Sequence, residues 1–493
     1  MIYICYKKLL IKHNITLVLL FILSQFLLDL HTPTTAQEPN LSSNPIGIIG
    51  GYWRPEAAEQ LSVGWDRIIF DWSRFQPNGP GDFVADAVRP SWIERNQQQG
   101  REVVGLIINT PAWASATPRI GVPNGLFLPY DDPGNLWGVF LTQLAEQYAP
   151  LGIHHWIIWN NIDIPSIASN TAFIGDIAEY AQMVKIAYQA FNAVDENAKI
   201  YLGGINWWYD VSLGQPPYLS RLIERIKQDD SAALNNYYFD GVTLNFIIEP
   251  TPVGIYVPTT ETFNAVISET RRILVEEGLS TKPIWIHEMG ATVTQDDLRA
   301  LPNATISINP QQQAYFLVQG LALGLANGAE RVGIYRLFDN NFVVGEPAYG
   351  LLRDDNTARP AFAALQYITQ LIIPYQQVEY GNSTNARLVT FTQETQTIFI
   401  MWSAAEKPVS FWIEQAFQDN IDITDIYGNP LQSPRLGVGP EGVSVYVIDT
   451  SAAIPDPNDN IWISGAPIVV IIDTTQPRRV WGSLGDAVGI QLR

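Results

Sequence analysis

The chain has 493 residues, a formal net charge of −20 and one cysteine, Cys5. The length allows two domains, or one large domain with an appendage. The acidic balance argues against nucleic acid and anionic membranes as partners, because a strongly negative surface repels both, and it suits a neutral partner. A single cysteine excludes a disulfide framework and a cysteine metal site.

Residues 1–36 have the pattern of a secretory signal peptide. Three lysines precede an apolar run over residues 15–30, and the small residues at 34–36 offer a cleavage site. We therefore expect a secreted or extracytoplasmic protein with no membrane partner after cleavage, and a short linker over residues 37–44. A retained membrane anchor is the alternative, because the apolar run is near the lower length limit of a spanning helix.

Residues 45–377 alternate short runs rich in Ile and Val with longer segments of helical period, which is typical of parallel βα units. The predicted strands cover residues 46–52, 67–72, 102–109, 153–159, 199–204, 241–246, 283–288 and 331–337. The clearest predicted helices cover residues 136–148, 174–194, 262–277, 311–326 and 360–372. Eight such units predict a (β/α)8 TIM barrel rather than an open doubly wound sheet, which usually has fewer strands and a nucleotide loop near its start.

Residues 378–473 have a different pattern, with short strands separated by turn residues. The predicted strands cover residues 387–392, 397–403, 409–413, 421–427, 443–448 and 467–472. This spacing predicts a small antiparallel β-sandwich domain. Segment 437–442 (GVGPEG) fits a nucleotide-binding pattern formally, but it contains Pro440 and opens no helix, so we interpret it as a turn. The tail, residues 474–493, has no predicted structure.

Two of the predicted barrel strands end in a pattern that belongs to a known family. Active sites of such barrels lie at the C-terminal ends of the strands. Segment 156–164 (WIIWNNIDI) resembles the strand-four signature of clan A glycoside hydrolases, which closes on Asn-Glu-Pro, and segment 284–290 (IWIHEMG) resembles the strand-seven signature. Segments 64–77, 104–113 and 349–364 match further parts of the clan pattern, so the resemblance spans nearly the whole barrel.

The resemblance implies a retaining glycoside hydrolase, which acts on O-glycosyl bonds. Glu288 matches the nucleophile, Arg67 matches an arginine that keeps it ionised, and Asn160 matches an asparagine that binds the sugar 2-hydroxyl. Asn161 stands where the acid/base glutamate should be. Such hydrolysis normally uses two carboxyl groups. Because asparagine cannot give up a proton, the loss of general acid help should reduce the rate by about 10²–10⁴-fold.

Purely structural roles remain open as alternatives for several of these residues. Arg67 could be a structural ion-pair partner, and Asn160 could bond to its own turn. His287 neighbours Glu288 in the strand, so alternation predicts that it points away from the barrel axis and serves in packing. No metal-ligand spacing is present, and we expect neither a metal nor a cofactor.

Further candidates lie at or beyond the other predicted strand ends. Asn245 replaces the histidine and tyrosine that the clan has on strand six, and Tyr335 stands in place of a tryptophan after strand eight. Candidate platforms for sugar rings, with core packing as the equal alternative, are Trp53, Trp113, Trp207 and Trp208. Candidate substitutes for the missing acid, with ordinary surface exposure as the alternative, are Asp163 and Glu249.

Three functional hypotheses follow from the sequence. The first is a secreted glycoside hydrolase-like protein that acts on an oligosaccharide, polysaccharide or glycoside with an impaired or relocated general acid. The second is a carbohydrate-binding pseudoenzyme that has lost turnover. The third is a barrel that serves only as a scaffold or interaction surface.

Overall fold

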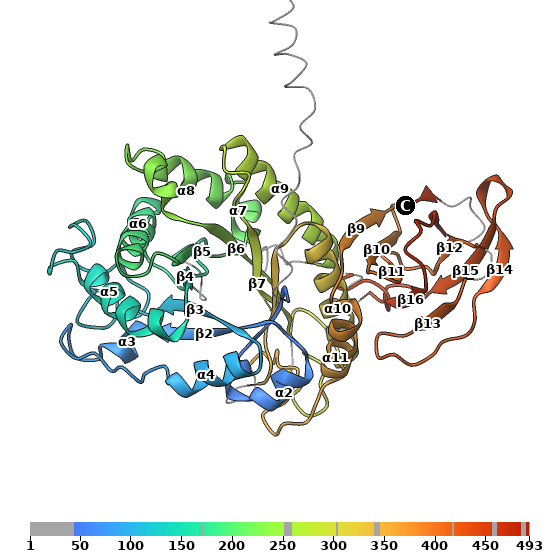
Figure 1. The fold of residues 1–493 in the computed structure, drawn as a ribbon, viewed down its shortest axis with the longest axis horizontal. Coiled ribbons are helices and arrows are strands. Elements are labelled where there is room, and N and C mark those ends of the chain that lie inside the picture. The colour runs from blue at the N-terminus through green and yellow to red at the C-terminus, as the bar shows by residue number, and fades with distance from the viewer. Residues whose placement is uncertain are drawn as a thin grey trace, which may run out of the picture. The chain divides into compact units, whose positions relative to one another are not determined.

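Eight parallel strands close into a barrel in the computed structural model (Figure 1). Each strand pairs with the next one along the chain, and β8 closes the barrel on β1. The predicted (β/α)8 barrel is confirmed. The strands are β1 (Ile46–Ile49), β2 (Trp65–Asp71), β3 (Glu102–Ile108), β4 (His155–Asn160), β5 (Lys199–Ile205), β6 (Gly241–Ile248), β7 (Ile284–Ala291) and β8 (Arg331–Ile334).

The structure describes residues 44–166, 168, 171–250, 259–301, 304–339, 346–416, 419–455, 461–484 and 490–492. The predicted signal peptide and residues 37–43 of the predicted linker lie outside these ranges. Within them, the helices are all too short or too polar to cross a lipid bilayer.

Helices follow the barrel strands and surround them (Figure 1). Side-chain caps set some of the helix starts. The Asp176 carboxylate accepts from the Glu179 N–H and the Glu179 carboxylate from the Asp176 N–H, so the helix after β4 begins at Ile177 rather than at 174. The helices are α2 (Pro55–Gln60), α3 (Trp72–Phe75), α4 (Pro90–Gln98), α5 (Leu136–Tyr148), α6 (Ile177–Val194), α7 (Trp208–Leu213), α8 (Tyr218–Ile226), α9 (Phe263–Glu276), α10 (Pro310–Ala326) and α11 (Pro360–Ile372). Short 3-10 turns are η1 (Gly51–Trp53), η2 (Ala149–Leu151), η3 (Ala233–Tyr238), η4 (Thr260–Thr262) and η5 (Pro440–Gly442).

Large apolar side chains fill the inside of the barrel. Trp285 stacks on Tyr201 with 3.9 Å between ring centroids, and Trp65 lies 6.2 Å from Trp285. Val104, Leu106 and Ile157 complete this buried cluster. The interior is therefore packed, and polar side chains gather beyond it at the two ends of the barrel, including the C-terminal ends of the strands.

The β6–β7 pairing breaks register at the point where the functional side chains begin. Leu244 lies opposite Ile286, but the next residue, Asn245, lies opposite Glu288. One extra residue, His287, is therefore accommodated in β7, as in a β-bulge. Alternation of side chains cannot be extrapolated across this point.

Residues after α11 form two five-stranded antiparallel sheets, in the orders β13-β16-β11-β10-β9 and β14-β15-β12-β17-β18. The predicted β-sandwich is confirmed. Four strands were not predicted, and two of them, β17 and β18, lie in the tail that had no predicted structure. The strands are β9 (Gln377–Asn382), β10 (Ala386–Thr392), β11 (Thr397–Ser403), β12 (Val409–Glu414), β13 (Ile421–Thr424), β14 (Arg435–Val438), β15 (Ser444–Thr450), β16 (Ile468–Ile472), β17 (Val480–Leu484) and β18 (Ile490–Gln491). Segment 437–442 contains the last two residues of β14 and then the turn to β15, which includes η5.

Candidate active site

A buried carboxylate and a buried arginine form the centre of the site. Glu288 on β7 is 6% exposed and Arg67 on β2 is 3% exposed. The Arg67 Nη1 atom forms an ion pair with Glu288 Oε1, and Asn160 Nδ2 donates to the same oxygen at 3.3 Å. Burial by itself would raise the pKa of Glu288, but the Arg67 charge and these hydrogen bonds hold that pKa below its ordinary value. Glu288 is thus an ionised carboxylate at neutral pH, as a nucleophile must be.

His287 belongs to the same polar network. Its Nδ1 atom accepts from Arg67 Nη1 at 3.2 Å, which leaves the proton on Nε2 for donation to Asn160 Oδ1 at 3.2 Å. Burial lowers the pKa of His287 to about 3, so the ring is neutral. The prediction that His287 points away from the axis and serves in packing is wrong, because the extra residue in β7 turns its side chain toward Arg67.

Three asparagines share hydrogen bonds beside this pair: Asn160 ends β4, Asn161 follows it, and Asn245 lies on β6. Asn245 Nδ2 donates to Asn160 Oδ1 at 3.0 Å and to Asn161 Oδ1 at 2.8 Å. Gly204 on β5 lies against them, and a Cβ atom added there would collide with the side chains of Asn160, Asn245 and His287. The network therefore depends on a glycine that no sequence pattern singles out.

Asn161 has the backbone of a turn, with φ at 54°. Its Oδ1 accepts from Asn245 and also from Asn206 Nδ2 at 3.2 Å. The Asn161 Nδ2 group has no partner among the described residues and lines the same cavity as Glu288. It can donate a hydrogen bond to a ligand there, but it cannot transfer a proton. Asn206, which follows β5, is a further residue that sequence reasoning missed.

The cavity has a volume of about 270 Å³, near the lower end of the range of small-molecule sites. The residues that matter here are Trp53, Arg67, Asn160, Asn161, Glu288 and Tyr335. Trp53 is 43% exposed and belongs to an aromatic cluster, with its ring centroid 5.3 Å from Tyr52 and 4.9 Å from Trp92. An indole held this way offers a flat apolar face to a sugar ring.

The other candidate tryptophans lie away from this cavity. Trp113 packs edge-on against Trp72, and its Nε1 donates to the Gln76 carbonyl at 2.6 Å. Trp207 is 5% exposed, and Trp208 is buried edge-on against Phe246. These three fit the alternative of core packing, whereas Trp53 fits that of a sugar platform.

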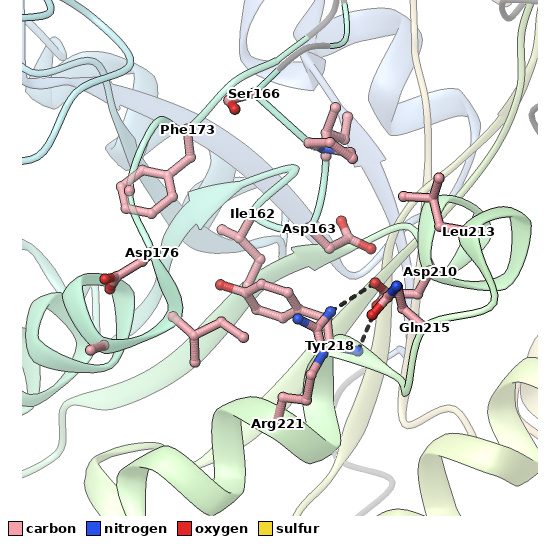
Figure 2. Close-up of a pocket in the computed structure, with 15 residues that line it drawn as sticks. Ile162, Asp163, Ser166, Phe173, Asp176, Asp210, Leu213, Gln215, Tyr218 and Arg221 are labelled. Carbon is pink, nitrogen blue, oxygen red and sulfur yellow. Dashed lines mark hydrogen bonds and ion pairs between the residues drawn. The ribbon is translucent and has the colours of Figure 1, made fainter.

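Asp163, the first candidate acid, faces a neighbouring cavity. Its carboxylate accepts from Asn206 N at 2.8 Å, from Asn206 Nδ2 at 2.9 Å and from Trp207 N at 2.9 Å. Burial raises its pKa to about 6. Figure 2 shows it in that second cavity, of about 640 Å³, together with Asp210 and Arg221. Asp163 is not among the residues that line the cavity of Glu288.

Glu249, the second candidate acid, follows β6, and like Asp163 it is not among the residues that line the cavity of Glu288. Its Oε2 accepts from Tyr349 Oη at 3.0 Å, and the Tyr349 ring packs edge-on against Tyr335, which lines the cavity. Burial raises the pKa of Glu249, and the negative charge of Glu288 raises it further. The pKa values of Glu249 and Glu288 are thus shifted in opposite directions, which is the division that acid catalysis needs.

The described residues contain no cluster of His, Cys, Asp and Glu suited to a metal ion. What the arrangement can do chemically rests on the carboxylates, the arginine and the amides: it can present an ionised nucleophile, hydrogen-bond sugar hydroxyls and stack a ring.

Comparisons with known proteins match the fold. No protein-family model matches the sequence, and no curated protein matches it. Among solved structures, a family 39 glycoside hydrolase from Bacteroides cellulosilyticus WH2 is similar, with a TM-score of 0.62, 14% identity, and coverage of 87% of this chain and 81% of that one. Also similar is a family 30 subfamily 8 xylanase from Clostridium acetobutylicum, with a TM-score of 0.53, 10% identity, and coverage of 87% of this chain and 96% of that one. A monomeric beta-xylosidase from Caulobacter crescentus CB15 has a TM-score of 0.52 and 10% identity, with coverage of 90% of this chain and 98% of that one. The chain thus has the barrel-plus-sandwich fold of these glycoside hydrolases.

Proposed function

We propose that this protein binds a glycoside at the C-terminal end of its barrel and cleaves the O-glycosyl bond with retention, through attack of Glu288 on the anomeric carbon. The observation that supports this most is a buried carboxylate that Arg67 keeps ionised and that still opens into a cavity. The similar structures include a xylanase and a beta-xylosidase, so xylosides are the first substrates to test.

The general acid in this proposal is Glu249 rather than a residue at position 161. Its raised pKa keeps it protonated at a pH where Glu288 is ionised. Asp163 is the weaker candidate, because Asn206 and Trp207 occupy both of its oxygens and it faces the second cavity. The signal peptide predicted from residues 1–36 would support export, and we propose an extracytoplasmic site of action.

Covalent labelling tests the nucleophile. A 2-deoxy-2-fluoro glycoside with a dinitrophenyl leaving group should add one sugar to the protein, and peptide mapping should place it on Glu288. Glu288→Gln should abolish labelling, whereas the matched control Glu146→Gln, an exposed position on α5, should label normally. No labelling with any sugar configuration would contradict the proposal.

Leaving-group dependence tests the acid. Glu249→Gln should leave kcat/KM for dinitrophenyl glycosides nearly unchanged and lower kcat/KM for alkyl glycosides by about 10²-fold or more, because in the first step only a poor leaving group needs a proton. Asn161→Glu should speed the hydrolysis of the same poor substrates. An unchanged rate in Asn161→Glu would mean that the site is not built as the clan resemblance implies.

The Asn161 amide favours one second candidate, a carbohydrate-binding protein without turnover. Calorimetry separates the two. Saccharide affinity without labelling of Glu288 would support the binding protein, and the absence of both would leave the scaffold hypothesis.

A further inference from the structure

Arg336, which follows β8, lines the same cavity as Glu288. Its Nε atom is buried and has no hydrogen-bond partner. No ion pair with its guanidinium forms among the described residues, and its one aromatic neighbour is the Tyr335 ring, whose centroid lies 5.7 Å from the Cζ atom. The cavity therefore contains an arginine whose charge the protein itself does not balance.

This is unexpected in a chain with 49 acidic and 29 basic residues. The buried arginines at the same end of the barrel are paired: Arg67 with Glu288, and Arg359 with Asp296 and Asp339. Segments 251–258 and 340–345, which the structure does not describe, contain no Asp or Glu. Arg336 as a whole is only partly buried, so its other N–H groups can be hydrated, whereas its buried Nε atom has no acceptor. An anionic group of a ligand in this cavity would supply the acceptor that Arg336 lacks.

The charge balance of the cavity agrees with this argument. Among the residues that line the cavity, Arg67 is paired with Glu288 and Arg336 has no acidic partner; since the nearby His287 ring is neutral, the lining carries one positive charge in excess. We propose that the preferred ligand is an acidic sugar whose anionic substituent is bound by the Arg336 guanidinium. Carboxylate and sulfate groups share the geometry that a guanidinium binds with two parallel N–H groups. The proposal rests on the proposed function, since it concerns the same cavity.

The overall negative charge does not oppose this. Repulsion between the protein and an anionic sugar is screened beyond about 8 Å at physiological salt, whereas Arg336 acts at contact distance. Arg336 therefore determines whether an acidic or a neutral sugar is preferred. The composition of the chain favours a neutral partner, whereas this inference favours an anionic one.

Calorimetry with the full chain at pH 7 tests the preference. The ligands are matched sets of methyl glycosides with a neutral 6-hydroxymethyl group, a 6-carboxylate or a 6-sulfate, in the gluco and galacto series, together with xylosides. We expect one acidic member to bind at least about ten-fold more tightly than its neutral counterpart, as charge-assisted hydrogen bonds allow. Comparison of the carboxylate and sulfate ligands shows which substituent the protein binds.

Variants separate the role of Arg336 from general effects of charge. Arg336→Gln should remove the acidic preference, so that acidic and neutral members of a set bind equally, while Arg336→Lys should keep part of the preference. Arg435→Gln is the matched control, because that arginine is exposed on β14 and pairs with Asp449. It should retain the full preference.

Two results overturn the inference. The first is equal binding of neutral and acidic sugars, and the second is an acidic preference that persists in Arg336→Gln. In either case, the proposed function would still hold if a neutral fluoro-glycoside labels Glu288. If no sugar binds and Glu288 cannot be labelled, the inference and the proposed function fail together.

Discussion

Replacing Arg67 by methionine would leave the Glu288 carboxylate buried without its counter-ion. The side chains of the pair are only 2% and 8% exposed, so solvent screens their interaction little. Removal of one partner from a buried ion pair typically destabilises a protein by about 3–5 kcal/mol. Methionine fills part of the space, so most of this loss is electrostatic, and it should depend on pH in a defined direction.

The sign follows from the pKa of Glu288. In the wild type the folded-state pKa lies below the ordinary value, so the contribution of Glu288 to stability is full above about pH 4.3 and is lost as the pH falls through the lowered pKa. In Arg67→Met, burial dominates and the folded-state pKa rises above the ordinary value. The variant therefore loses stability as the pH increases from about 4.3. The difference between the two proteins should be small near pH 4 and reach about 3–5 kcal/mol near pH 7.

Urea unfolding at pH 4, 5.5 and 7 measures this difference. A double-mutant cycle with Glu288→Gln isolates the interaction between Arg67 and Glu288, because Arg67→Met should lower the free energy of unfolding much less when position 288 carries no charge. Arg95→Met is the control, since its pair with Glu56 is exposed and should contribute less than about 1 kcal/mol. A loss that does not change with pH, or that persists in the Glu288→Gln background, would refute the electrostatic account.

Three further predictions concern the same site. Gly204→Ala should lower the free energy of unfolding in urea by about 1–3 kcal/mol and abolish saccharide affinity in calorimetry, because the new Cβ atom collides with the amide network. Gly79→Ala is the control and should have neither effect, since a Cβ atom there meets no other atom within 4 Å. Trp53→Ala should weaken saccharide binding about ten-fold in the same titration with little loss of stability, since the indole is 43% exposed. The pH profile of kcat/KM should decline on its alkaline side with an apparent pKa above the ordinary glutamate value, and Glu249→Gln should remove that decline.

The sequence predicted the barrel well because its strands are short apolar runs between helices of clear period. It also predicted the side chains that parallel strands must bring to one rim. Glu288, Arg67, Asn160 and Asn161 come from three strands, and the structure places them within one network. Strand order alone suffices for that, since the C-terminal ends of all the strands face the same side.

What the sequence could not predict depends on register and close contact. His287 was assigned to packing because period-two alternation cannot anticipate one extra residue in a strand. Gly204 matters only through the side chains that converge on it. Arg336 had a usable signal, because an arginine just after the eighth strand lies at the rim where active sites form. Its lack of an acidic partner is visible only in three dimensions.

The extra residue in β7 has a consequence for how many functional groups a barrel can present. A regular strand offers every second side chain to the interior, so eight strands supply few groups at any one level. By accommodating one residue more than its neighbour β6, β7 directs both His287 and Glu288 to Arg67 and Asn160. One strand then delivers two adjacent groups, a hydrogen-bonding ring and a charged carboxylate, at a level where geometry would otherwise allow only one.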